Sequence, residues 1–387
     1  MKKGSMRPCA VVVGLCAHGL TIARSLHAAG VRVVALEVNR NLPGTRTRCA
    51  DVRFVSDING PGLIDALVRL APALGLPTPV LFLTNDRMIE TVGAHADSIA
   101  RRYRLSWANA RAALLPLLRK DQIESRCAET GLHYPKTRLI EDLGALSARV
   151  ADLRFPLIVK PTKPISAFKT IVAHTTQELD RARTLMAASM PVIVQEFIAG
   201  DDASIRFGAL YLNNGEIVAR FEGCKLRSKP MGHTTIAVSE RNNEIHELAR
   251  RFFGGLRLSG PVSLELKRGP DGTQWVIEPT VGRSDFWVGL CVANGVDLPL
   301  IEYRVESAET HDAYTQEDSH VWVNGERDPG AIGWLLAHAP RRIFTRRLRG
   351  VYADRKDIRP FIAAFARHAS SLPSRAVRKA GKVVLGP

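Results

Sequence analysis

The sequence predicts a chain of mixed α/β and α+β class, with an α/β domain first and two α+β lobes after it. Residues 8–105 alternate short apolar strands with amphipathic helices. Residues 106–190 read as linker helices and a small lobe, and residues 191–306 as a larger, strand-rich lobe. Residues 307–387 are less regular, and we expect a basic C-terminal extension there. At 387 residues the chain can hold two or three domains with cores of their own.

Four apolar runs define the amino-terminal α/β domain. We expect strands at residues 10–14, 31–36, 52–55 and 80–83, and a helix at residues 19–29. The turn before this helix is bounded by Gly14 and Gly19 but lacks the GxGxxG pattern, so no dinucleotide site is expected. Residues 84–86 follow the fourth strand, where open α/β sheets place ligands; a helix cap is the alternative.

The composition is that of an ordinary globular protein, with 45% hydrophobic and 24% charged residues. The longest apolar runs are far too short to cross a bilayer. Six cysteines are scattered without a CxxC pair, which favours free thiols over a disulfide framework or a metal site. We therefore expect a cytoplasmic protein.

The formal net charge of +16 is concentrated near the carboxyl-terminal end. Residues 341–387 contain 13 Lys and Arg residues and two acidic residues, Asp354 and Asp357. Such a tail either packs against the large lobe with its arginines in water or makes weak contact with an anionic membrane, which would place the protein peripherally at the inner membrane face. Nucleic acid is not expected as a partner, because aromatic side chains for base stacking are sparse in this tail.

The most informative segment is a strand–turn–strand pattern at residues 262–279. Asp271-Gly272 is a strong signal for a two-residue turn, because both central positions of such a turn favour positive φ. A turn at these residues places Glu265 directly opposite Glu278, with Cβ atoms roughly 5 Å apart. The predicted core side of this hairpin carries Leu264, Leu266, Trp275 and Ile277.

Two opposed carboxylates repel each other unless a positive group lies between them. A divalent cation that binds oxygen ligands, with phosphate groups completing its coordination, would satisfy both Glu265 and Glu278. Two surface glutamates on a solvated hairpin are the alternative.

Further charged residues occur in a fixed order around this pair. In chain order they are Lys120, Lys160, Glu196, Lys225, Arg227, Glu265, Glu278 and Arg283. Lysines for phosphates, an extended stretch at residues 195–198 for a flat base and two carboxylates for a metal are what a magnesium-bound adenine nucleotide requires.

In this order the residues resemble the ATP-grasp superfamily, over roughly residues 8–306, and within it the predicted carboxylate–amine ligases. The resemblance implies a Rossmann-like N-terminal domain followed by a two-lobed ATP-grasp fold that closes on ATP. It also implies an ADP-forming ligase that activates a carboxylate as an acyl phosphate and joins it to an amine, with Mg²⁺ or Mn²⁺ as the metal.

The resemblance gives each matching position a role. The implied nucleotide-binding residues are Lys120, Lys160, Lys169, Gln195, Glu196, Phe197, Ile198 and Asp202. The implied metal ligands are Glu265, Glu278 and Thr280. The implied catalytic residues are Arg283, which would offset charge on the transferring phosphoryl group, and the basic pair Lys225 and Arg227 on the neighbouring strand.

Two positions depart from the family pattern. Thr280 stands where the family usually has an asparagine metal ligand, which weakens a second metal site. The loop at residues 162–170 lacks the glycines of the phosphate-binding flap that many relatives have.

Two other functions share this nucleotide site. An ATP-dependent carboxylase would use bicarbonate as its acid, and a non-catalytic nucleotide-binding relative would be tethered by the basic tail. The expected partners are a small-molecule carboxylate and an amine, bound by loops at residues 84–86, 230–235 and 284–287. A homodimer is left open.

Overall fold

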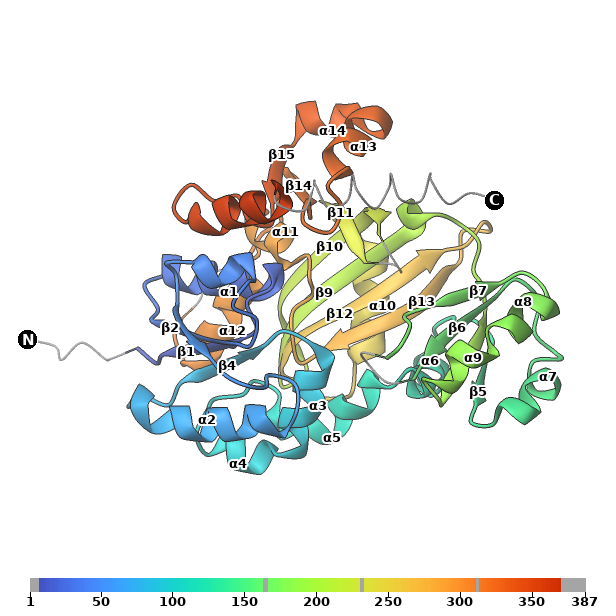
Figure 1. Ribbon diagram of the computed structural model, residues 1–387, viewed down its shortest axis with the longest axis horizontal. Helices are drawn as coiled ribbons and strands as arrows, with labels where there is room; N and C mark the ends of the chain where they lie inside the picture. Colours follow the sequence, from blue (N-terminus) through green and yellow to red (C-terminus); the bar gives the residue numbers. More distant parts are fainter. Residues whose placement is uncertain (1–6, 163–165, 230–232, 311–312, 370–387) are drawn as a thin grey trace, which may run out of the picture.

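The computed structural model describes residues 7–162, 166–229, 233–310 and 313–369. Their strands form three sheets (Figure 1). A four-stranded sheet of the amino-terminal domain lies at the left of the view and a second four-stranded sheet at the right. The seven-stranded sheet lies between them, and the C-terminal extension rises above it.

The amino-terminal sheet is parallel, with strand order β3-β2-β1-β4, which confirms the α/β prediction. Its strands are β1 Ala10–Val13, β2 Val33–Glu37, β3 Asp51–Phe54 and β4 Val80–Leu83. Its helices are α1 Ala17–Ala28, α2 Pro61–Leu74, α3 Asp86–Ala94 and α4 Ala96–Ala100. A Cβ at Gly19 would lie 1.8 Å from the carbonyl oxygen of Gly14, so this glycine permits the close turn from β1 into α1.

The second four-stranded sheet is antiparallel, with order β5-β8-β6-β7. Its strands are β5 Thr137–Ile140, β6 Leu157–Pro161, β7 Ile171–Ala173 and β8 Val192–Glu196, and short helices α7 Leu146–Arg149, α8 Thr176–Arg181 and α9 Arg183–Ala187 accompany them. β8 pairs within this small lobe, whereas the sequence division at residue 190 assigns it to the large lobe. The strand therefore enters the hinge from the small-lobe side.

The linker before the small lobe consists of short helical segments. They are α5 Arg111–Leu114, the 3-10 turns Leu115–Leu118 and Lys120–Gln122, and α6 Ile123–Thr130. β5 is absent from the sequence prediction, because its four residues form a strand only by pairing with β8.

The large lobe is built on a seven-stranded sheet of order β13-β12-β9-β10-β11-β14-β15. The strands are β9 Ile205–Asn213, β10 Glu216–Ser228, β11 Thr234–Ser239, β12 Gly260–Arg268, β13 Gln274–Val281, β14 His320–Val323 and β15 Arg347–Gly350. The helices are α10 Asn243–Phe253, α11 Val288–Ala293, α12 Leu298–Glu306, α13 Ala331–His338 and α14 Pro340–Thr345, and residues 359–369 are also helical. Since β14 and β15 continue this sheet, the C-terminal extension is an integral part of the large lobe.

The glutamate hairpin has the predicted pairing but a different turn. Glu265 pairs with Glu278, whereas Leu266 pairs with Val276, so Ile277 is an extra residue that forms a β-bulge. The loop is one residue longer than predicted: the N–H of Gly269 donates to the carbonyl of Thr273 (2.8 Å), and only Gly272 within the loop has positive φ, at 86°. The two one-residue offsets cancel at the glutamates.

The bulge also changes which residues face the core. Val276 is fully buried beneath α10 together with Leu264 and Leu266, as the cluster they share shows. Ile277 faces the opposite side and lines a cavity, and Trp275 is only half-buried, so the prediction that these two belong to the core side is wrong. Glu265 lies on the face opposite α10, because side chains alternate along β12.

Chain-distant contacts such as the following two hold the amino-terminal domain and the adjoining linker against the large lobe. Arg24 of α1 forms an ion pair with Asp357 at 2.9 Å, and both side chains are buried. Ser106 donates its hydroxyl to Glu302 of α12 at 2.7 Å. Among the helices of the described ranges, none is long and apolar enough to span a membrane. All six cysteines are free, as the sequence predicts.

Glu302 is expected to make the stability of the protein depend on pH. Burial raises its pKa from 4.5 to about 8, so its contribution is fully present below about pH 4.5 and is lost as pH rises through about 8. Glu302→Gln keeps the acceptor for Ser106 and removes this loss, worth about 5 kcal/mol at full ionisation. Urea unfolding of both proteins at pH 6 and pH 9.5 should resolve about 3 kcal/mol of this loss, because the unfolded carboxyl is already ionised at pH 6.

Glu129→Gln, at a carboxylate whose side chain is 63% exposed, is the matched control and should follow the wild type. Equal pH slopes for wild type and Glu302→Gln would contradict the argument.

Candidate active site

A cavity of about 300 Å³ lies where the small and large lobes meet. Eleven of the predicted site residues line it: Lys120, Lys160, Lys169, Gln195, Glu196, Phe197, Ile198, Asp202, Lys225, Glu265 and Glu278. They come from the linker, from the strands β6, β8, β10, β12 and β13, and from loops next to β7 and β9. Arg227, Thr280 and Arg283 are not in the lining. The fold therefore brings most of a dispersed sequence pattern to one place.

Lysines dominate the cationic side of this cavity. Besides the four predicted lysines, the lining contains Lys267, whose Nζ lies 4.5 Å from the centre of the Phe197 ring. Sequence reasoning missed Lys267, although its place two residues after Glu265 on one strand face was a signal for it. Five ammonium groups around one cavity suit a polyphosphate anion.

Gln195 orients Lys160. The Nζ of Lys160 donates to Oε1 of Gln195 at 3.0 Å, and Nε2 of Gln195 donates to the hydroxyl of Thr137 at 2.8 Å. Since the Gln195 side chain is buried and engaged at both ends, it holds the lysine toward the cavity. Of this lysine–glutamine pair, only the Lys160 ammonium can therefore contact a ligand.

Burial, together with the neighbouring lysines Lys120 and Lys169, lowers the pKa of Lys160 to about 8 against the opposing effect of Glu278. Bound phosphates would keep the ammonium protonated. Affinity for ADP is therefore expected to fall above pH 8, by up to about tenfold per pH unit, because binding then requires uptake of a proton. Isothermal titration calorimetry at pH 7 and pH 9.5 measures it.

Lys160→Arg is the control, because arginine stays charged throughout this range. An unchanged slope in this variant would assign the titration to another group.

The hinge at residues 196–198 presents one free backbone donor. The N–H of Glu196 donates to the carbonyl of Lys136 at 3.0 Å. The N–H of Phe197 donates to the carbonyl of Pro156 at 3.0 Å. Ile198 lines the cavity, and its N–H has no hydrogen-bond partner in the part of the chain that the structure describes. A flat base with an acceptor on its edge would satisfy this group.

Other polar groups at the hinge have local roles. Glu196 accepts a hydrogen bond from the backbone N–H of Arg154 at 3.0 Å. Asp202 accepts one from the backbone N–H of Ser228 at 2.5 Å, which ties the hinge loop to β10. Both carboxylates still line the cavity.

Each glutamate of the hairpin lies beside a lysine. The Nζ of Lys225 is 2.6 Å from Oε1 of Glu265, and both side chains are buried. The Nζ of Lys120 is 3.7 Å from Oε2 of Glu278, whose side chain is 34% exposed. The opposed carboxylates are thus compensated by lysines in the protein itself.

The two carboxylates differ in their readiness to bind a cation. Burial raises the pKa of Glu265 despite the adjacent Lys225. Burial also acts to raise the pKa of Glu278, but Lys120, Lys169 and Lys160 outweigh it and lower the value to about 2. Glu278 is therefore ionised at neutral pH, and its 3.7 Å contact with Lys120 leaves its oxygens without a short hydrogen bond among the described residues.

These oxygens fit a hard divalent cation such as Mg²⁺. In the described ranges no group of three or more His, Cys, Asp and Glu side chains is arranged to hold a metal ion. Glu265 and Glu278 would consequently supply two protein ligand groups, and phosphate oxygens of a nucleotide would supply others.

Thr280 is engaged with an acidic residue that the sequence analysis did not assign. Its hydroxyl donates to Oδ2 of Asp285 at 3.2 Å, and the hydroxyl of Ser263 donates to the same oxygen at 3.4 Å. The other oxygen of Asp285 accepts from the backbone N–H of Phe286 at 2.6 Å. Thr280 therefore anchors the loop that follows β13.

Arg283 connects this loop to the amino-terminal domain. Its Nε lies 2.6 Å from Oδ1 of Asp86, just past the end of β4. Nearby, the buried His18 lies 2.9 Å from the hydroxyl of Ser284 and 3.3 Å from the carbonyl oxygen of Thr84. Burial, with Arg283, lowers the pKa of His18 to about 3, so its imidazole is neutral. The predicted loops 84–86 and 284–287 thus meet; residues 230–232 of the third lie outside the described residues.

Arg227 points elsewhere. Its Nε lies 2.5 Å from Oδ2 of Asp328, and its guanidinium carbon is 5.3 Å from the Trp334 ring centre. A register shift between Lys225 and Arg227 accompanies their different partners. Lys225 thus faces the cavity and Arg227 the C-terminal extension.

A second arginine approaches the loop after β13. The guanidinium carbons of Arg283 and Arg327 lie 5.5 and 5.8 Å from the centre of the Phe286 ring. Burial lowers the pKa of His233, and Lys169 and Arg327 lower it further. The exposed guanidinium of Arg327 has no carboxylate partner within the described part of the chain. Sequence reasoning missed Arg327, since nothing in its local sequence marks it.

Comparison with models of protein families and with curated proteins gave no match. Solved structures do match. An ADP complex of N5-carboxyaminoimidazole ribonucleotide synthetase has a TM-score of 0.67 at 15% identity, over 85% of this chain and 86% of that one. The biotin carboxylase domain of Hydrogenobacter thermophilus 2-oxoglutarate carboxylase has a TM-score of 0.65 at 13% identity, over 82% and 74%. L-amino acid ligase from Bacillus licheniformis has a TM-score of 0.58 at 16% identity, over 78% and 75%.

All three are ATP-grasp proteins, and each match spans most of both chains. The alignment confirms the architecture that the residue pattern implies. The chain therefore has a Rossmann-like N-terminal domain followed by a two-lobed ATP-grasp fold.

Proposed function

We propose that this protein is an ATP-dependent carboxylate–amine ligase that forms an acyl phosphate and releases ADP and phosphate. One observation carries the proposal: a single cavity is lined by five lysines, by Ile198 with its free hinge N–H, and by the Glu265–Glu278 pair. The solved N5-carboxyaminoimidazole ribonucleotide synthetase, which has the same fold, is an ADP complex, and the biotin carboxylase domain was solved with MgADP. ATP and Mg²⁺ are accordingly the proposed nucleotide and metal.

The first step transfers a phosphoryl group. An oxygen of the substrate carboxylate attacks the γ-phosphorus, the bond to the bridging oxygen breaks, and ADP leaves. Negative charge on the phosphates is offset by Lys120, Lys160 and Lys169. The N–H of Ile198 orients the adenine base. Magnesium bound to Glu265 and Glu278 would neutralise further charge on the phosphate oxygens.

The second step forms the amide. A neutral amine attacks the acyl carbon, the bond from this carbon to the phosphate oxygen breaks, and the nitrogen releases a proton. The carboxylate substrate would lie beside the loop after β13, where Arg283 and the exposed Arg327 flank Phe286. A guanidinium there binds a carboxylate and stabilises the oxyanion that develops on it.

Trapping with hydroxylamine tests this function. The protein is incubated with ATP, Mg²⁺ and a panel of carboxylic acids, and hydroxamate and ADP are measured together. An acyl phosphate gives equal amounts of both. Formation of AMP and pyrophosphate would show that the carboxylate is adenylated and would contradict the acyl-phosphate mechanism.

The same assay separates the alternatives. Turnover that requires bicarbonate and no other acid would identify a carboxylase. Nucleotide binding without turnover for any acid would identify a non-catalytic relative.

A further inference from the structure

The C-terminal extension carries most of the exposed apolar side chains of the described protein. Eight of 13 such large side chains lie there: Ile332, Leu336, Phe344, Leu348, Ile358, Phe361, Ile362 and Phe365. Phe344 of α14 is 84% exposed and Phe365 is 69% exposed. We call the surface formed by α13, α14, β15 and the helix at residues 359–369 the C-terminal face.

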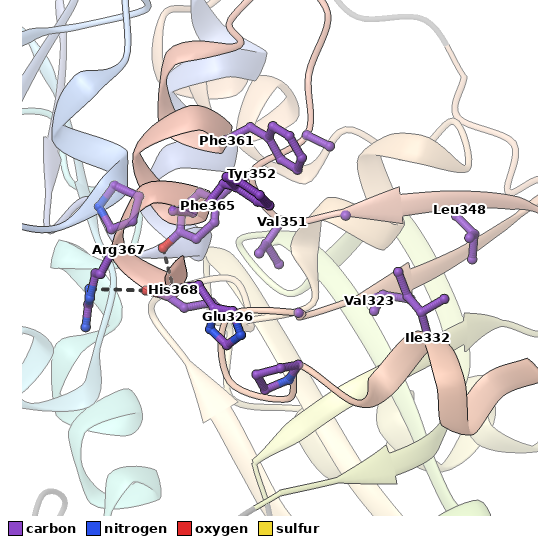
Figure 2. A pocket seen from close by; sticks show the side chains of 16 residues that line it. Val323, Glu326, Ile332, Leu348, Val351, Tyr352, Phe361, Phe365, Arg367 and His368 are labelled. Carbon is purple, nitrogen blue, oxygen red and sulfur yellow. Dashed lines mark hydrogen bonds and ion pairs between the residues drawn. The ribbon is translucent and has the colours of Figure 1, made fainter. Parts of the chain in front are cut away.

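Four of these apolar side chains line a groove of about 590 Å³ (Figure 2). Ile332, Leu348, Phe361 and Phe365 come from three different elements and all line it. Val323, Val351 and Tyr352 are buried and complete its apolar wall. Four exposed side chains in one groove form a contiguous patch of the kind that marks a binding surface.

The same face is almost purely cationic. Its exposed basic residues Arg341, Arg347, Arg355, Lys356 and Arg359 have no carboxylate partner among the described residues. The acidic residues on or beside this face each have a partner. Glu326, which lines the groove, pairs with Arg367 at 3.5 Å and accepts a hydrogen bond from the hydroxyl of Tyr352 at 2.6 Å. Asp354 pairs with Arg349 at 3.2 Å, and Asp357 is buried against Arg24 at 2.9 Å.

We propose that the C-terminal face docks on an anionic lipid surface. Unpaired basic side chains next to exposed phenylalanines match a bilayer interface, where phosphates lie above acyl chains. A second copy fits poorly, because a two-fold interface through this face would bring like charges together. This role is independent of the reaction in the hinge cavity.

Co-sedimentation of the full-length protein with lipid vesicles tests the proposal. We expect binding to vesicles of phosphatidylcholine and phosphatidylglycerol in equal amounts, and none to phosphatidylcholine alone. Raising the salt to roughly 0.5 M should release the protein, because the Debye length falls well below 8 Å.

Paired variants identify the surface. Phe344→Ser/Phe365→Ser and, separately, Arg341→Gln/Arg347→Gln should each lower partitioning at least tenfold. The matched controls are Leu76→Ser/Leu185→Ser, at exposed apolar side chains elsewhere, and Arg101→Gln/Arg268→Gln, at exposed arginines elsewhere. The two control variants should keep wild-type partitioning. All four variants should keep the wild-type melting temperature.

Three results would overturn the proposal. They are equal binding to neutral vesicles, absence of binding to anionic vesicles at low salt, and a dimer by light scattering that Phe344→Ser/Phe365→Ser converts to monomer. Failure of ATP turnover would bear on the proposed ligase alone, since vesicle binding needs no reaction.

Discussion

Replacing Glu278 by glutamine is expected to lower ATP turnover at least about 100-fold, because it removes the carboxylate charge that would hold Mg²⁺ at the reacting phosphates. Glutamine keeps the size of the side chain, which lines the hinge cavity 3.7 Å from Lys120. Release of ADP measures turnover, and the melting temperature verifies folding. Lys160→Met, which removes a positive charge from the same cavity, is expected to have an effect of similar size.

Glu216→Gln is the matched control. Glu216 is an exposed carboxylate at the start of β10, outside the cavity, and its variant should retain wild-type turnover. Near-wild-type release of ADP by Glu278→Gln or Lys160→Met would show that the nucleotide site is misplaced.

Lys225→Met is expected to destabilise the protein by about 3–5 kcal/mol, because it leaves the buried carboxylate of Glu265 without its partner at 2.6 Å. Since burial raises the pKa of Glu265, this carboxylate can protonate, and the loss should be smaller at pH 5 than at pH 8. The double variant Lys225→Met/Glu265→Gln should recover much of the stability. Urea unfolding at both pH values measures these differences.

Arg250→Met supplies a matched control, because Arg250 and Glu247 are also 2.6 Å apart but both are about half exposed. Solvent screens this pair, so its loss should change the unfolding free energy little. A similar small effect for Lys225→Met would mean that the Glu265 carboxylate is solvated in the unliganded protein.

The sequence alone determined the α/β domain, the order of the site residues and the opposition of Glu265 to Glu278. These features depend on local periodicity and on turn residues, which act over a few positions. Even so, the glutamate pairing holds because a longer loop and the bulge at Ile277 offset each other. A one-residue register change alters which side chains face the core, and no local signal marked that bulge.

Tertiary structure decided what local sequence does not specify. β5 exists because β8 pairs with it, β14 and β15 extend the large sheet, and Arg227 turns to Asp328 instead of the cavity. The lysine partners of the two glutamates and the approach of Arg327 to Phe286 also come from segments far apart in the chain. Such contacts form only when the lobes pack, because burial and charge pairing between distant segments set their geometry.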